Sequence, residues 1–289
     1  EDVGAYLVEH PDVTFVAFTG SKAVGLGIVR EAAVHRDGQR HVKRVIVEMG
    51  GKNAVIVDGD ADLDVAVPAI TYSAFGYAGQ KCSAASRVIA VGPVLDELVD
   101  RLAGAAAIVP VGHASELRTV VGPLIDADAH RRVLQYHDIA RNEGKVVVQR
   151  NDIPAGGWFA GPTVVVTERP DARVATEEVF GPLLTCLRAD DFDHALALAN
   201  HTEYALTGGL FSRSPARIRH AARHFRAGNL YVNRGITGAL VGRQPFGGFG
   251  LSGVGSKAGG PDYLLQFVEP RVLTENLLRQ GFAPTGEIE

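Results

Sequence analysis

Short apolar runs rich in valine and isoleucine alternate with amphipathic segments along most of the chain, and this alternation constrains the fold more than any other feature. RVIVEM (44–49), NAVIVD (53–58) and SRVIAV (86–91) have the length and β-branched content of strands. DADAHRRVLQYHDIARNEG (126–144) has the periodicity of a helix and ends in glycine. Strands that alternate with helices form parallel βαβ units, so the sequence predicts an α/β fold.

Further segments extend this pattern. VTFVAF (13–18) is expected to form a buried strand, and residues 19–33 a glycine turn that opens a helix. ADLDVAVPAITYSAFGYA (61–78) is expected to form a helix capped by an aspartate. Beyond Gly235 the sequence is dense in glycine and proline but keeps apolar side chains such as Phe246. An ordered loop around a site is therefore a better interpretation than a flexible linker.

The composition is that of a soluble globular protein. Hydrophobic residues make up 46% of the 289 residues and charged residues 21%, with a net charge of −4. Neither nucleic acid nor a membrane surface is an expected partner, and no apolar run reaches the roughly 18–20 residues that cross a bilayer. The two cysteines, Cys82 and Cys186, form no disulfide framework, which favours a reducing cytoplasm. The histidines lack metal-ligand spacing, so no metal site is expected.

The start of the chain is unusual for a complete protein. It opens with EDVGAYLVEHPDV, without an initiator methionine or a signal peptide. We therefore expect the chain to be a piece of a longer protein. We also expect it to be inactive and poorly stable alone.

The first feature with chemical meaning is FTGSKAVG (18–25), where a strand passes through Thr-Gly-Ser into a helix. Gly20 would let the backbone approach a ligand, and the free N–H groups at a helix start attract phosphate. Turns of this kind are common in α/β proteins, so the pattern alone also fits a purely structural role.

Glu48 and Cys82 are candidate catalytic residues. Glu48 ends a β-branched run and is closely followed by two glycines, so its carboxylate must be paired, capped or used in chemistry. Cys82 lies in GQKCSAASR (79–87), whose polar residues do not resemble a core. A thiolate attacks carbonyls, and the positive charge of Lys81, helix N-terminal amides or a carboxylate base could activate this thiol. Cys186, in the apolar run PLLTCLRA, fits an inert core position.

Together these motifs resemble the aldehyde dehydrogenase family. VEMGGKNA looks like the glutamate signature of that family and FGYAGQKCSAAS like its cysteine signature, with Glu48 and Cys82 34 positions apart (82 − 48). EEVFGPLL (177–184) matches the family's Glu-x-Phe-Gly-Pro cofactor motif, and FTGSKAVG matches its phosphate-side turn. The resemblance implies an α/β fold in which the end of a Rossmann-type NAD-binding domain precedes an α/β catalytic domain.

The resemblance also implies roles for the matching residues. Cys82 would form a thiohemiacetal with an aldehyde, hydride would pass to the nicotinamide, and Glu48 would activate the water that hydrolyses the thioester. The backbone N–H of Cys82 would donate to the oxyanion. The residues expected to bind NAD are Gly20, Ser21, Val24, Met49, Gly50, Glu178 and Phe180. The family's ribose-binding lysine and its oxyanion-hole asparagine have no match in this sequence.

Two stretches narrow the substrate. GQKCSAAS and NRGITGALVGRQPFGGFGLSGVGSKAGGPDYL (233–264) together resemble the branch that oxidises L-glutamate γ-semialdehyde, the 1-pyrroline-5-carboxylate dehydrogenases of proline catabolism. In that branch the serine after the nucleophile and a glycine turn hold the substrate carboxylate, and an aromatic ring packs on its aliphatic part. The residues implied here are Ser83, Gly238, Ala239 and Phe246. A glycine turn suits a carboxylate because no side chain blocks the converging donors.

The resemblance further implies an organisation of the chain. Residues 1–48 would complete the NAD-binding domain, residues 49–255 would form the catalytic domain, and residues 256–289 would contact another subunit of a homo-oligomer. The parent protein could also be fused to a proline dehydrogenase. The choice between NAD and NADP stays open, because the residues that decide it lie mostly upstream in this family.

Three alternatives compete with this interpretation. The chain could belong to another semialdehyde dehydrogenase, such as one specific for succinic or methylmalonic semialdehyde. It could be a non-redox cysteine acyltransferase or hydrolase, although no Cys–His pairing is visible in the sequence. It could also be a catalytically inactive descendant of the fold, but such a descendant would be expected to have lost Cys82 or Glu48.

Overall fold

In the computed structural model, which describes residues 2–276 and 278, most of the chain builds a seven-stranded sheet. The strand order is β10-β9-β3-β4-β7-β6-β5, and every neighbouring pair is parallel except β5 with β6. The strands are β3 (Ala54–Val57), β4 (Arg87–Val91), β5 (Lys145–Gln149), β6 (Thr163–Val166), β7 (Leu183–Ala189), β9 (Thr207–Phe211) and β10 (Asn229–Val232). This arrangement confirms the predicted α/β class.

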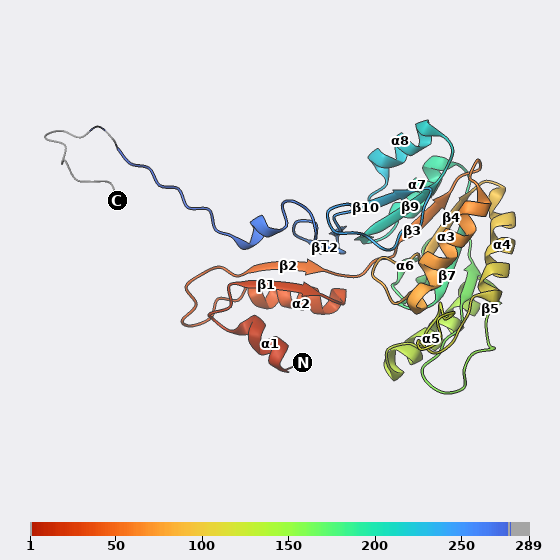
Figure 1. Cartoon of the computed structure of the whole chain (residues 1–289), viewed down its shortest axis with the longest axis horizontal. Coiled ribbons are helices and arrows are strands. Elements are labelled where there is room, and N and C mark those ends of the chain that lie inside the picture. Colours follow the sequence, from red (N-terminus) through yellow and green to blue (C-terminus); the bar gives the residue numbers. More distant parts are fainter. Residues whose placement is uncertain (1, 277, 279–289) are drawn as a thin grey trace.

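Helices cover both faces of the sheet, as right-handed crossovers require (Figure 1). α3 packs with α4 on one face, and α7 packs with α8 on the other. The helices are α3 (Leu63–Phe75), α4 (Val94–Ile108), α5 (Ala127–Glu143), α6 (Arg173–Thr176), α7 (Phe192–Asn200) and α8 (Pro215–His224). Asp62, Asp126 and Asp191 cap α3, α5 and α7 by accepting from first-turn N–H groups. Among the described residues, no helix is long and apolar enough to cross a membrane.

A smaller unit formed around the amino-terminal residues projects from the large sheet (Figure 1). Its strands β1 (Phe15–Thr19) and β2 (Arg44–Glu48) are parallel, and β12 (Gly253–Val254) pairs antiparallel with β2. α1 (Asp2–Glu9) and α2 (Lys22–Ala32) pack beside these strands. The remaining elements are β8 (Tyr204–Ala205), β11 (Phe249–Gly250) and the 3₁₀ turns η1 (Gly76–Gly79) and η2 (Leu264–Phe267).

The structure corrects two expectations about individual elements and adds one strand that the sequence did not indicate. The sequence predicts a buried strand over 13–18, but β1 lies at a sheet edge, with Ala17 and Thr19 exposed. The helix expected over 61–78 ends at Phe75, because the chain then turns left-handed. Strand β9 is not evident in the sequence, since the two glycines of TGGLF obscure the pattern although all its residues are buried.

The amino-terminal ends of β3, β4 and β9 meet at one edge of the large sheet. Ala54 at the start of β3 lies between Arg87 of β4 and Gly208 of β9. The smaller unit joins at this same edge, because β2 ends at Glu48 and the chain leads directly into β3. The segments that precede these three strands are therefore brought together with the end of β2.

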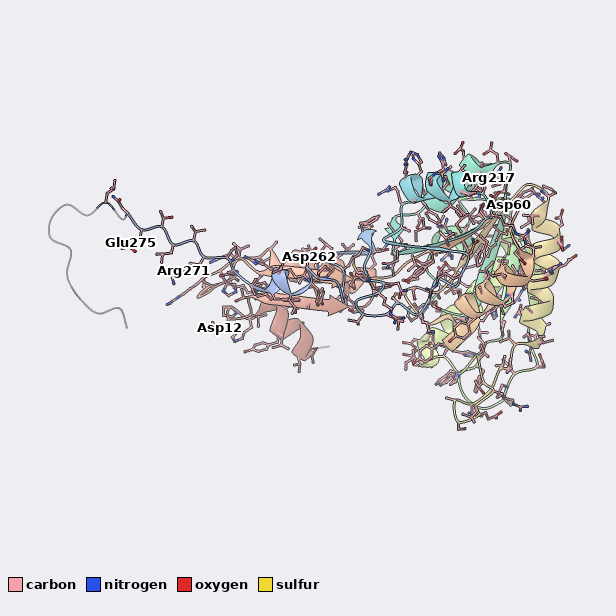
Figure 2. All side chains as sticks on the ribbon, turned by 45° about the horizontal axis from the view of Figure 1, so that its top comes forward. Asp12, Asp60, Arg217, Asp262, Arg271 and Glu275 are labelled. Carbon is pink, nitrogen blue, oxygen red and sulfur yellow. The ribbon has the colours of Figure 1, made fainter. Side chains whose placement is uncertain are left out.

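An ion pair between a buried carboxylate and a partly exposed guanidinium holds the opposite, carboxyl-terminal edge. Asp58, which follows β3, is fully buried and accepts hydrogen bonds from Ser212 Oγ (2.7 Å), the Gly59 N–H (2.8 Å) and the guanidinium of Arg217 in α8. Figure 2 shows Arg217 and Asp60 close together at this edge, far from the smaller unit. The pair therefore anchors α8 to the sheet at a distance from the residues expected to be catalytic.

Replacing Asp58 by alanine is expected to lower the free energy of unfolding by about 3 kcal/mol, because Arg217 and Ser212 lose a buried acceptor. Chemical denaturation of the 289-residue chain measures the change. Asp193→Ala is the matched control, since it removes an exposed pair with His220 and should cost less than about 1 kcal/mol. Equal losses for the two variants would contradict an anchoring role for Asp58.

Candidate active site

Cys82 lies in a loop that a left-handed turn sets between α3 and β4. Tyr77 and Ala78 have φ angles of 60° and 55°, and Gly79 follows at 65°. A Cβ on Gly79 would lie 2.5 Å from the Gly181 carbonyl oxygen, so only glycine fits there. Two consecutive non-glycine residues in this region are strained, and such strain persists only where the surrounding structure fixes it. The turn therefore holds the cysteine loop against the Glu-x-Phe-Gly-Pro segment.

Asn53 fixes the other side of this loop. Its side-chain amide donates to the carbonyl oxygens of Cys82 (2.7 Å) and Ala84 (2.8 Å), and its Oδ1 accepts from the Thr207 N–H (3.0 Å). A buried amide with three such partners joins the amino-terminal ends of β3 and β9 to the cysteine loop. Asn53 was not among the residues expected to act at the site, and its position within VEMGGKNA is the only sequence signal for it.

Glu48 ends β2 at the junction of the two units. The glycine-rich segment 246–257 wraps around it, and the Met49 N–H donates to the Ser252 carbonyl oxygen (2.8 Å). A Cβ on Gly247 would lie 2.8 Å from Glu48 Oε1. Among the described residues, no hydrogen-bond partner reaches the buried Oε2 of Glu48. Because leaving a buried carboxylate oxygen unpaired is costly, this atom is suited to act on a bound molecule.

Burial and mutual repulsion set the protonation states of the two candidates. Burial raises the pKa of Glu48 to about 7, opposed by the positive charge of Lys257 and the backbone N–H of Gly248. Burial also raises the pKa of the Cys82 thiol, and the negative charge of Glu48 raises it further, while the Ser83 N–H opposes both. Glu48 is thus close enough to act electrostatically on the thiol. A carboxylate with a pKa near 7 is suited to general acid–base chemistry.

The structure gives no support to the possibility that Lys81 activates the thiol. Its ammonium lies 5.6 Å from the ring centroid of Tyr72 and 6.0 Å from that of Tyr77, both exposed side chains. The pKa of Cys82 is raised rather than lowered. A carboxylate base is therefore the better candidate for removing the thiol proton.

Glu178 lies directly against the glycines that follow Glu48. Its Oε1 accepts from the Gly51 N–H (2.9 Å), and a Cβ on Gly50 would overlap its carboxylate. Burial raises the pKa of Glu178, opposed by the Gly51 N–H and by Lys52. Lys52 is itself fully buried, and burial lowers its pKa to about 7. The segment around Glu48 and the segment around Glu178 therefore meet, although these two residues are 130 positions apart in the sequence (178 − 48).

An open cleft of about 790 Å³ lies between α2 and the Glu178 segment. Ser21, Lys22, Glu178 and Tyr204 line it, and Ser21 also caps α2 by accepting from the Val24 N–H (3.3 Å). A helix start with an adjacent lysine suits a pyrophosphate, and a carboxylate suits a ribose hydroxyl pair. The glycine at position 50 leaves room beside that carboxylate. These residues therefore fit a dinucleotide.

The other residues expected to bind the cofactor occupy different places. Gly20 lies one residue before the cap of α2. Val24 faces a separate apolar groove of about 720 Å³ that α1 also lines. Met49 is buried and packs against Gly25 of α2. Phe180 has a φ of 54°, is partly exposed and lines a small pocket beside Glu178.

The residues expected to hold the substrate lie on two loops. Ser83 is buried directly after the cysteine. Gly238, with a φ of 81°, and Ala239 lie in the loop that follows β10, where a Cβ on Gly238 would meet open space. Phe246 is partly buried, and its N–H donates to the Ala258 carbonyl oxygen (2.9 Å).

Ser73 of α3 connects these two loops. Its Oγ accepts from the Ile236 N–H (3.2 Å), just before the glycine turn. Its carbonyl oxygen accepts from the Ala85 N–H (3.0 Å), just after Ser83. The end of α3 therefore aligns the glycine turn with the cysteine loop. Sequence analysis missed Ser73, because a serine inside a helical pattern gives no signal of such a contact.

The chemistry available at this junction is that of a thiol beside a carboxylate of nearly neutral pKa. The thiol can add to a carbonyl, and the carboxylate can take up a proton from the thiol or from a water. Among the described residues, no group of three or more histidines, cysteines and carboxylates is placed to hold a metal ion.

Comparison with known proteins gives a consistent result. The sequence profile of the aldehyde dehydrogenase family matches residues 1–273. The chain is 47% identical over 274 residues to 1-pyrroline-5-carboxylate dehydrogenases of Geobacillus kaustophilus and Bacillus subtilis. These alignments cover 95% of this chain and 53% of each relative. The chain therefore spans about half the length of the curated relatives it matches.

Solved structures show the same likeness. Proline utilization A (PutA) from Bdellovibrio bacteriovorus superposes with a TM-score of 0.94 and 54% identity, covering 98% of this chain and 30% of that one. A 1-pyrroline-5-carboxylate dehydrogenase from Thermus with bound NAD superposes with a TM-score of 0.90 and 48% identity, covering 92% of this chain and 52% of that one.

Proposed function

Because the chain belongs to the aldehyde dehydrogenase family, we propose that it is part of an NAD-dependent enzyme that oxidises L-glutamate γ-semialdehyde to L-glutamate. The observation that carries this proposal is the convergence of Glu48, Cys82 and Glu178 at the junction of the two units. The 47% identity to 1-pyrroline-5-carboxylate dehydrogenases supports the choice of substrate.

In this proposal Cys82 is the nucleophile. Its proton passes to Glu48, and Sγ bonds to the aldehyde carbon to give a thiohemiacetal, whose oxygen faces the backbone N–H of Cys82. Ser21, Lys22 and Glu178 would hold NAD in the cleft. The chemistry supplied by bound NAD is acceptance of the hydride from this adduct, which leaves a thioester on Cys82.

Glu48 then acts as the general base for hydrolysis. Its carboxylate takes a proton from a water as the water oxygen bonds to the thioester carbon. The carbon–sulfur bond breaks, L-glutamate leaves, and the thiolate of Cys82 is restored. The pKa of about 7 allows Glu48 to accept a proton in one step and to release it afterwards.

We extend the proposal to the organisation of the chain. Residues 1–48 form the carboxyl-terminal remainder of the NAD-binding domain and residues 49–255 the catalytic domain, with β12 returning to pair with β2. Residues 256–289 contact another subunit of a homo-oligomer, although 277 and 279–289 lie outside the described residues. The likeness to bifunctional proline utilization A supports a fusion to proline dehydrogenase in the parent protein.

A chimaeric enzyme tests the proposal. It joins residues 1–289 to the part of the Bacillus subtilis relative that this chain does not match. With NAD and L-glutamate γ-semialdehyde, the chimaera is expected to produce reduced nicotinamide, measured by its absorbance. A folded chimaera that binds NAD but produces none would contradict the proposal. If the chimaera hydrolysed activated esters but produced no reduced nicotinamide from the semialdehyde, the cysteine hydrolase alternative would be favoured instead.

Replacing Ser83 by alanine is expected to lower kcat/KM of the chimaera for the semialdehyde by about 10- to 100-fold, because a hydrogen bond to a charged carboxylate is lost. For butanal, which has no carboxylate, the expected loss is less than about threefold. Ser86→Ala is the matched control, since its hydroxyl donates to the Asn53 carbonyl oxygen in the same loop. Equal losses for the two aldehydes would remove the substrate-anchoring role of Ser83.

A further inference from the structure

Lys257 has no role in the chemistry described above, yet its ammonium is held by several partners. Its Nζ donates to the carbonyl oxygens of Gly228 (2.7 Å) and Gly247 and to Asn229 Oδ1 (3.3 Å). Asn229 in turn donates to the Pro245 carbonyl oxygen (2.9 Å). A single ammonium thus ties the start of β10 to the loop at 245–247. These contacts fix where that loop lies.

The loop that Lys257 holds lies directly against Glu48. A Cβ on Gly247 would be 2.8 Å from Glu48 Oε1 and 3.5 Å from Lys257 Cα, so Gly247 lies close to both residues. A Cβ on Gly228 would overlap the Gly247 carbonyl oxygen. The Glu48 carboxylate, the loop and the Lys257 backbone therefore approach one another closely at Gly247.

The groups that face Glu48 come from two segments. The Lys257 ammonium and the Gly248 N–H come from the glycine-rich segment, and both favour the ionised carboxylate. The Cys82 thiol comes from the cysteine loop, where Glu48 and Glu178 both raise its pKa. The effect of Lys257 is reciprocal, because burial lowers the pKa of Lys257 and the charge of Glu48 opposes that change.

We propose that Lys257 is a positioning residue for Glu48, holding the glycine loop against the carboxylate and supplying the positive charge that keeps it ionised. The proposal rests on the proposed function of Glu48 as the general base. It predicts that neutral replacements of Lys257 shift the titration of Glu48 and the pH dependence of hydrolysis together. Arginine keeps the charge and is expected to preserve both.

Carboxyl-carbon NMR of the chimaera with ¹³C-labelled glutamate measures the Glu48 titration directly, and the spectrum of Glu48→Gln assigns the signal. In Lys257→Gln and Lys257→Met the Glu48 midpoint is expected to rise by roughly half a unit or more. In Lys257→Arg it is expected to stay near its native value. Lys43→Met is the matched control, because Lys43 is buried beside the His10 carbonyl oxygen at the other end of β2.

Reciprocity supplies a second measurement that leaves Lys257 in place. In Glu48→Gln the ammonium of Lys257 is expected to titrate at lower pH than in the native chain, because the stabilising carboxylate is gone. An unchanged Lys257 midpoint in this variant would overturn the proposal even if the neutral Lys257 variants did not fold. An unchanged Glu48 midpoint in a folded Lys257→Gln variant would overturn it equally.

The pH dependence of the chimaera separates this proposal from the proposed function. A general base must be ionised, so a higher Glu48 pKa in Lys257→Gln is expected to move the acidic limb of kcat to higher pH. If Glu48→Gln left hydrolysis unaffected while the NMR coupling persisted, the role of Glu48 as base would fail and the coupling would stand. In an enzyme whose hydrolysis depends on Glu48, the Glu48 midpoint and the acidic limb of kcat should shift together. If Lys257→Gln moved the midpoint but left the acidic limb unchanged, the role of Lys257 in the reaction would be overturned.

Discussion

Replacing Cys82 by serine in the chimaeric enzyme is expected to lower kcat for semialdehyde oxidation by about 10⁴-fold or more. A serine hydroxyl keeps the shape of the side chain but is far less acidic, and a carboxylate with a pKa of about 7 is too weak a base to ionise it. Without the sulfur adduct, no hydride leaves the aldehyde carbon. The absorbance of reduced nicotinamide measures the loss, and nucleotide binding by the variant confirms that the cleft is intact.

Cys186 provides the matched control for this variant. It is fully buried in β7, and burial raises its pKa to about 12, so it has no means of acting as a nucleophile. Cys186→Ser is expected to keep kcat within about threefold of the parent once folded, although a buried hydroxyl destabilises the sheet. If activity followed Cys186 rather than Cys82, the assignment of the nucleophile would be wrong.

Replacing Glu48 by glutamine is expected to separate the two halves of the reaction. The amide cannot accept a proton from water, so hydrolysis of the thioester should slow by about 10²- to 10⁴-fold. Formation of the adduct needs a single proton transfer, which solvent can accept at higher pH. Rapid mixing should therefore show a burst of about one reduced nicotinamide per site, followed by a slow steady rate.

The pH dependence of the parent chimaera adds a check on the same residue. The proposed general base must be ionised, and the pKa of Glu48 is raised to about 7, so hydrolysis should fall as the pH drops below about 7. This acidic limb should vanish in Glu48→Gln. A variant that shows neither a burst nor a change in the pH profile would assign hydrolysis to another base.

Much of the fold could be predicted because strands and helices carry their own local signals. Runs such as RVIVEM and capping residues such as Asp126 indicate elements directly. β9 gave no such signal, because its glycines carry neither β-branching nor alternation and the strand forms only by pairing with β3 and β10. The exposure of β1 depends on what lies beside it in space, which a local apolar run does not report.

The candidate site also contains some residues that the sequence indicates and others that it does not. Glu48, Cys82 and Glu178 stand out because each lies in a motif of unusual composition, and the structure places them together. Asn53 and Ser73 act through hydrogen bonds to backbone groups far along the chain, so apart from the place of Asn53 in VEMGGKNA nothing in their local sequence reveals them. The failed expectation for Lys81 has a similar cause, because adjacency in sequence does not show that its ammonium stacks on tyrosine rings.

Trapping the covalent adduct tests the central claim most directly. The Glu48→Gln chimaera is mixed with NAD and glutarate semialdehyde, whose acyl group has no amine to cyclise and leave, and is then digested and analysed by mass spectrometry. An acyl group is expected on the peptide that contains Cys82, formed only when NAD is present. Reduced nicotinamide produced without any acyl group on Cys82, or an acyl group carried by another residue, would contradict that claim.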